Sequence, residues 1–152
     1  MPIAEPRRDD VMTDYGTLNR LYPQTVTYKV DNKNYILMED ENGEFLIKEI
    51  SQKGKLDKDI SSGQFSRYFD IIQVAYDDKN KNTYTYICAI SLGGKKMKLF
   101  QANNLGIDKK YSKDYVINGR KSFNFFFIDG LLHLFECDED NKGRYSIYSI
   151  SF

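Results

Sequence analysis

Apolar and polar residues alternate with a period of two along most of this chain from residue 25 onward. In TVTYKV, residues 25–30, the apolar side chains Val26, Tyr28 and Val30 alternate with Thr and Lys, which is typical of a strand with one face in water. The segments NYILME and FLIKEI follow, separated by DENGE, whose Gly43 suits the positive φ of a hairpin turn. The pattern therefore predicts an antiparallel β-meander.

The same order of strands and turns recurs twice. The second set is FDIIQVAY, TYTYICAI and MKLFQA, and the third is SFNFFFI, LLHLFEC and RYSIYSISF. Turn glycines Gly43, Gly94 and Gly143 recur at intervals of about 50 residues, the length of one supersecondary unit. We predict one all-β domain over residues 21–152, built from three divergent antiparallel β-meander repeats at about 21–66, 67–119 and 120–152. The polar connectors between the sets are expected to be exposed, and each is available as a fourth strand.

The last repeat differs in its hydrophobic pattern. The run FNFFFI does not alternate, so both of its faces are apolar, as in a strand that is covered on both sides. In YSIYSI, Tyr145 and Ile147 fall on one face and Tyr148 and Ile150 on the other. We expect this repeat to be the most buried part of the molecule.

The N-terminal residues 1–20 follow a different pattern. Residues 1–8 contain Pro2 and Pro6 and resemble a flexible tail, and Val11, Tyr15 and Leu18 then recur at helical spacing. The segment is predicted to be a short helix or an irregular arm that covers one end of the β-domain.

Repeats of this length with three or four antiparallel strands are typical of β-propeller blades. The stretch VTYKVDNKNYILMEDENGEFLIKEISQKGKL resembles the repeat of tachylectin-type β-propeller lectins, although the chain has none of the Trp residues common in them. The resemblance implies propeller-like blades and carbohydrate binding. Because propellers need four to eight blades, three repeats require a homodimer that completes a six-bladed ring. The alternative fold is a single-chain up-and-down β-barrel of the lipocalin kind, or a sandwich.

Composition narrows the class of partner. Lys plus Arg and Asp plus Glu number 22 each, so no net charge attracts nucleic acid, and no run is long enough to cross a membrane. The start of the chain lacks the apolar core of a secretory signal, which predicts a cytoplasmic protein, or a secreted one whose signal has been removed. Cys88 and Cys137 are too few for a disulfide scaffold; both free thiols and a single disulfide remain open.

No motif of catalysis or metal binding stands out. His133 lies in the apolar strand LLHLFEC without a nucleophile motif, and Cys137 is about 13 Å further along the same strand face. DEDNKG, residues 138–143, resembles the start of a calcium loop, but Lys142 stands where an oxygen ligand is needed. SLGGKK lacks the spacing of a phosphate-binding loop. We therefore predict no enzyme activity, no cofactor and no metal.

Arginine and tyrosine recur near the start of each repeat. Both residue types are frequent at binding hot spots, and tyrosine rings also suit sugars. The leading hypothesis is a non-enzymatic module that recognises a glycan or a protein surface through loops between the repeats. The alternatives are a lipocalin-like carrier of a lipophilic ligand and a cytoplasmic inhibitor or immunity-type protein that binds one partner. The candidate contact residues are Arg20, Tyr22, Arg67, Tyr68, Tyr111, Tyr115 and Arg120.

Overall fold

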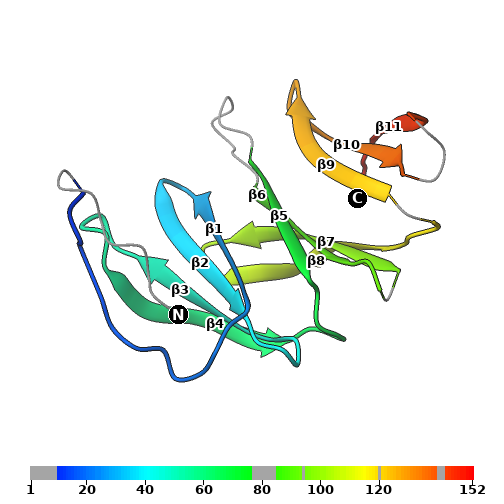
Figure 1. Ribbon diagram of the computed structural model, residues 1–152. Helices are drawn as coiled ribbons and strands as arrows, with labels where there is room; N and C mark the ends of the chain where they lie inside the picture. Colours follow the sequence, from blue (N-terminus) through cyan, green and yellow to red (C-terminus); the bar gives the residue numbers. More distant parts are fainter. Residues whose placement is uncertain (1–9, 77–84, 94, 120, 140–142) are drawn as a thin grey trace.

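The computed structural model describes residues 10–76, 85–93, 95–119, 121–139 and 143–152. These residues form eleven β-strands and no helix, arranged as three antiparallel sheets (Figure 1). The prediction of an all-β protein is confirmed.

Within each sheet every strand pairs antiparallel with its neighbour in the chain. The first sheet contains β1 (Gln24–Val30), β2 (Lys33–Glu39), β3 (Glu44–Ile50) and β4 (Leu56–Gln64). The second contains β5 (Ile71–Tyr76), β6 (Thr85–Ser91), β7 (Lys96–Asn103) and β8 (Gly106–Val116). The third contains β9 (Lys121–Ile128), β10 (Leu131–Asp138) and β11 (Tyr145–Ser149).

The barrel alternative is wrong, and the N-terminal segment takes the second of its two predicted forms. The sheets remain separate and none closes into a barrel, so the lipocalin-like alternative does not describe this chain. Residues 10–22 are not helical; they form the irregular arm that was the other expectation for this segment. The arm runs along the outside of the first sheet (blue in Figure 1), because its contacts are made to loops of that sheet rather than within one helical turn.

The polar connectors form the fourth strands of the first two sheets. β4 and β8 each pair with the strand before them, with irregular register near Lys48 and between Phe100 and Gln101. Their polar composition reflects their position at the outer edge of each sheet, where β4 in particular is largely exposed.

Two apolar cores lie between the sheets. The face of the second sheet that carries Ile87 packs against the first sheet, and the opposite face packs against the third. The first core includes Tyr28, Leu37, Ile47, Phe69, Ile87 and Phe100. The second includes Cys88, Ile90, Leu99, Phe123, Leu132 and Leu134.

The three sheets spread from their first strands like a fan (Figure 1). β1 contacts β5, and β5 contacts β9. Polar side chains reinforce both junctions: Gln24 Nε2 donates to the Asp70 carbonyl at 2.6 Å, and Gln73 Nε2 donates to the Phe123 carbonyl at 3.0 Å. The second sheet therefore has one face toward the first sheet and the other toward the third.

The expectation that the last repeat is the most buried is wrong. Tyr145, Ile147 and Tyr148 on β11 are all at least half exposed. The faces were assigned correctly, since Tyr145 and Ile147 lie opposite Cys137 and Phe135 while Tyr148 lies opposite Leu134. Only the face that carries Leu134 is covered, because the described chain supplies no sheet against the other.

Candidate functional site

The outer face of the third sheet, which points away from the second sheet, is apolar and uncovered. Strand register places eleven residues on it, and every one of them is exposed or half-buried. None is Lys, Arg, Asp or Glu, although such residues make up 29% of the chain. The face consists of Ser122, Asn124, Phe126, Ile128, Leu131, His133, Phe135, Cys137, Tyr145, Ile147 and Ser149.

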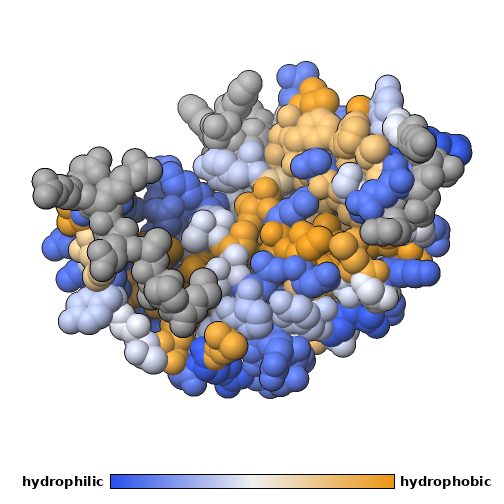
Figure 2. All heavy atoms as spheres, in the orientation of Figure 1, coloured by the Kyte–Doolittle hydropathy of each residue, from blue (hydrophilic) through white to orange (hydrophobic). Residues whose placement is uncertain are grey.

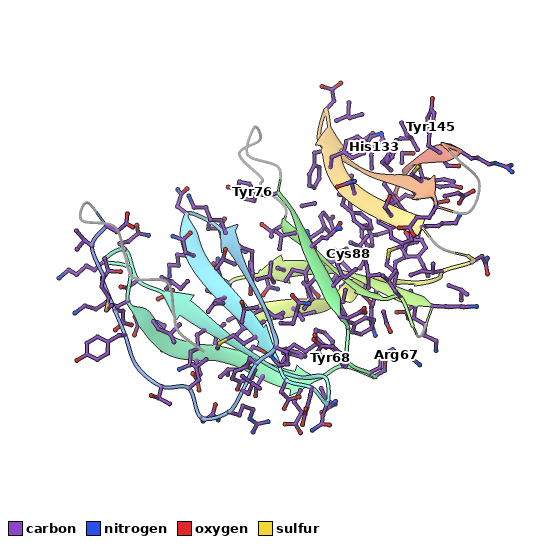
Figure 3. The ribbon with its side chains drawn as sticks, in the orientation of Figure 1. Arg67, Tyr68, Tyr76, Cys88, His133 and Tyr145 are labelled. Atoms are coloured by element: carbon purple, nitrogen blue, oxygen red, sulfur yellow. The ribbon has the colours of Figure 1, made fainter. Side chains whose placement is uncertain are left out.

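Aromatic pairs give this face a flat, ordered surface. Phe126 stacks on His133 with ring centroids 5.6 Å apart, and Phe135 stacks on Tyr145 at 5.6 Å. Hydrophobic residues gather at this end of the molecule in Figure 2, and Figure 3 shows His133 and Tyr145 on the third sheet. Large exposed apolar patches are rare on monomeric soluble proteins and mark interaction surfaces. The face is therefore the first candidate functional site.

The opposite end of the fan is the outer face of the first sheet, and the arm runs over it. Thr13 Oγ1 donates to the Gly54 carbonyl at 2.8 Å, and Asp14 Oδ2 accepts from the Leu56 amide at 2.7 Å. A hollow of about 850 Å³ remains between the arm and the sheet. Its lining includes Leu18 of the arm and Met38, Leu46 and Ile50 of the sheet.

A second hollow, of about 430 Å³, lies where β8 meets the third sheet. Tyr115 and Tyr148 line it together with Lys113, Lys121 and Glu136. Lys121 Nζ lies 3.0 Å from Glu136 Oε1, and this hydrogen-bonded pairing raises the pKa of Lys121. The hollow thus combines two aromatic rings with an ion pair.

The predicted contact residues lie in separate regions. Arg20 and Tyr22 belong to the arm, where Arg20 Nη1 pairs with Asp40 Oδ2 at 2.8 Å and also with Glu44. Arg67 and Tyr68 lie in the segment between β4 and β5, near the start of β5 in Figure 3. The Arg67 Nε atom is buried without a hydrogen-bond partner among the described residues.

The remaining predicted residues lie on or beside β8. Tyr111 is exposed and sits under the Lys110 ammonium, which is 5.5 Å from its ring centroid. Tyr115 lines the second hollow, and burial together with the nearby Cys88 raises its pKa. Arg120 lies outside the described residues. Arg20 and Tyr22 line one hollow, and Arg67 and Tyr68 are neighbours in the chain, but the structure does not bring the predicted set into one site.

The pKa values of two adjacent carboxyl groups at the end of β2 are shifted in opposite directions. Glu39 is fully buried; burial first, and then the charges of Asp40 and Asp70, raise its pKa to about 7. Its Oε1 accepts from the Phe69 amide at 2.7 Å, while Oε2 has no partner among the described residues. Burial alone would raise the pKa of Asp40 as well, but Arg20 and the amides of Asn42 and Glu44 hold it below its usual value.

The side chains that the sequence offers for catalysis or metal binding are His133, the two cysteines and the calcium-like loop. His133 Nδ1 lies 2.8 Å from the Leu131 carbonyl and the ring stacks on Phe126, so its contacts are those of a packed side chain. Cys88 is buried and free, with its thiol pKa raised by burial, and Cys137 is also free. Among the residues the structure describes, no three His, Cys, Asp or Glu side chains are grouped to hold a metal. Half of the calcium-like loop, residues 140–142, falls outside them.

Sequence reasoning missed the outer face of the third sheet as a site. The relevant pattern was present, because FNFFFI is apolar on both faces, but it was interpreted as burial within one chain. No family model matches the sequence, and no curated protein is significantly similar to it. In the same described ranges, no helix is long and apolar enough to cross a membrane.

Proposed function

We propose that this chain is a non-enzymatic binding module that docks a protein surface through the outer face of its third sheet. The observation that carries the proposal is the composition of that face, which has exposed Ile128, Leu131 and Ile147 and no charged residue. A surface of this kind is unfavourable in water and becomes favourable when an apolar partner covers it, at about 25 cal/mol for each Å² removed from water.

We infer further that the sheets act as propeller-like blades. The order of first-strand contacts and the meander within each sheet support this inference. In such an arrangement each sheet packs between two others, so a partner is required wherever the series of sheets stops.

Site-specific photo-crosslinking in cells tests the docking function. A photoreactive residue at position 147 is expected to give one defined adduct, because Ile147 is exposed on the outer face. The same residue at position 58 serves as the control, since Lys58 is exposed on β4 at the edge of the first sheet. Adducts of equal yield at both positions, or none at position 147, would reject the proposal.

The hollow beside β8 favours a second candidate, recognition of a glycan. Tyr115 and Tyr148 supply rings for stacking on a sugar, and Lys121 with Glu136 supplies polar contacts. We expect binding on a glycan array to be lost in Tyr148→Ala and retained in Tyr111→Ala, whose ring lies elsewhere on β8. An empty array for the wild-type chain would remove this candidate.

A further inference from the structure

We propose that the surface docked by the third sheet belongs to a second copy of this chain, in a head-to-tail pair. In this pair the outer face of the third sheet of each chain covers the arm side of the first sheet of the other. The inference rests on the proposed docking function and names its partner. Three features of the chain carry it.

The first feature is the way the sheets already pack. In the first core, the face of the first sheet that points to the next sheet in the chain packs against the face of the second sheet that points back to it. The second core repeats this with the second and third sheets, where Ile90 and Leu99 meet Leu134. In each interface, the forward face of one sheet therefore packs against the backward face of the next. A head-to-tail contact repeats this arrangement between chains, because it joins the forward face of the third sheet to the backward face of the first sheet in the other chain.

The second feature is the apolar character of the arm. Although the arm covers the first sheet, it turns Val11, Tyr15 and Leu21 toward water, and Tyr15 is 88% exposed. The two ends of the fan thus carry two apolar surfaces, one on the arm and one on the third sheet. A contact between the third sheets of two chains would cover only one of these surfaces, whereas head-to-tail pairing covers both.

The third feature is symmetry. A head-to-tail contact forms a closed assembly only if its rotation returns to the start, and otherwise it forms filaments. Two fans of three sheets supply six, within the range of four to eight in which radial β-assemblies close. The pair therefore has two identical interfaces related by a twofold axis.

Light scattering after size exclusion tests the pair with two single variants. Ile147→Glu places a charge on the third-sheet surface, and Leu21→Glu places one on the arm surface; both positions are exposed in the single chain. The wild-type chain is expected at twice 17.8 kDa, and each variant alone at the mass of one chain. Leu105→Glu, at an equally exposed position in the turn between β7 and β8, is the control that leaves the pair intact.

Mixing the two variants provides the decisive step. The Leu21→Glu chain keeps an intact third sheet and the Ile147→Glu chain keeps an intact arm, so one of the two interfaces can form again. The mixture is therefore expected to contain mixed pairs, with weaker affinity than the wild type. Matching circular dichroism spectra for all variants would show that loss of the pair is not loss of the fold.

Three results would overturn the inference. The wild-type chain at 17.8 kDa at every concentration would do so, and so would a continuous ladder of larger species. A pair that tolerates Leu21→Glu but not Ile147→Glu would show that two third sheets face one another. The photo-crosslinking experiment separates these failures from failure of the docking function, because an adduct with a different protein would retain the docking face and reject the second copy.

Discussion

The two ends of this fan of sheets differ in what covers their outer faces. At the first sheet, Met38 lies on the outer face, lines the hollow beneath the arm and is almost completely buried. At the third sheet, Ile147 lies on the outer face and is half exposed, with no arm across it. A sheet with two apolar faces needs a cover on each, and this chain supplies the second cover at only one end. Differences in core packing, in turn strain and in the pH dependence of stability between the two ends are expected from this contrast.

The largest effect is expected on β10, where neighbouring positions lie on opposite faces. Leu134 is 4% exposed in the second core, and Leu131 is 59% exposed on the outer face. We expect Leu134→Ala to lower the free energy of unfolding by about 2–5 kcal/mol, because it leaves a cavity between the second and third sheets. Leu131→Ala is expected to cost less than about 1 kcal/mol. Urea unfolding, at a protein concentration that gives single chains, measures both.

Equal losses for the two variants would contradict the contrast between the faces. Such a result would mean that Leu131 on the outer face is packed as tightly within the single chain as Leu134 in the second core. The comparison uses the same substitution on the same strand, so differences in strand propensity largely cancel.

Turn glycines at the two ends give the next largest difference. Gly43 in the β2–β3 turn and Gly143 before β11 have φ of +82° and +78°. A Cβ at Gly43 would lie 2.6 Å from the Arg67 carbonyl oxygen, whereas a Cβ at Gly143 meets no atom within 4 Å. We expect Gly143→Ala to cost about 1–2 kcal/mol from the left-handed backbone alone. Gly43→Ala carries the same strain plus a backbone clash, and its loss is expected to be roughly twofold greater.

Thermal unfolding of the two alanine variants measures this difference. A similar change in melting temperature for both would show that the segment around Arg67 moves aside without cost. It would then follow that the first sheet is no more tightly packed at this turn than the third.

The buried Glu39 makes stability depend on pH at the first-sheet end. Its pKa is about 7 in the folded chain against 4.5 ordinarily, so between these values the unfolded chain releases a proton that the folded chain keeps. Stability from this group is complete below pH 4.5 and is lost as pH rises through 7; the loss is on the order of 3 kcal/mol. Asp40 acts in the opposite sense: its lowered pKa supports the fold above its ordinary value and that support is lost as pH falls.

Denaturant titrations of the wild type and Glu39→Gln between pH 5 and pH 8 check this prediction. The variant keeps an oxygen that can accept from the Phe69 amide, and its stability is expected to change little across this range. A wild-type profile as flat as that of the variant would show that Glu39 remains charged in the folded chain.

How far the sequence predicts this structure depends on which physical contacts set each feature. Alternation and turn glycines depend on neighbours in the chain, so the β-meanders and the Gly43 turn were predictable. The outer strands β4 and β8 were harder, because strands at a sheet edge do not need an apolar pattern. The buried state of Glu39 was not predictable, since the Phe69 amide that donates to its carboxyl group lies thirty residues away in the chain.

The candidate site was also only partly predictable, because its exposure depends on contacts that are distant in the sequence. The pattern of FNFFFI correctly indicates two apolar faces, but a sequence pattern does not say whether the cover comes from the same chain. The Arg and Tyr positions were chosen from residue type alone, and the fold distributes them between the arm, the segment before β5 and β8. Their contacts are set by the sheets that surround them, which local sequence does not reveal.

The smallest expected effect concerns the arm itself. Arg20 ties the arm to Asp40 and Glu44 at the β2–β3 turn, while Thr13 and Asp14 hold it near Gly54. Arg20→Gln is expected to raise the rate of chymotryptic cleavage at Tyr15 by roughly two- to fivefold, because it removes an ion pair that ties down the arm. A small decrease in melting temperature is expected with it, because the buried Asp40 loses the cation that lowers its pKa. Arg144→Gln, at an exposed position beside β11, is the control. If cleavage at Tyr15 does not change, the hydrogen bonds of Thr13 and Asp14 are enough to hold the arm over the first sheet. In that case the cover at the first-sheet end is fixed near Gly54, and Arg20 adds little to it.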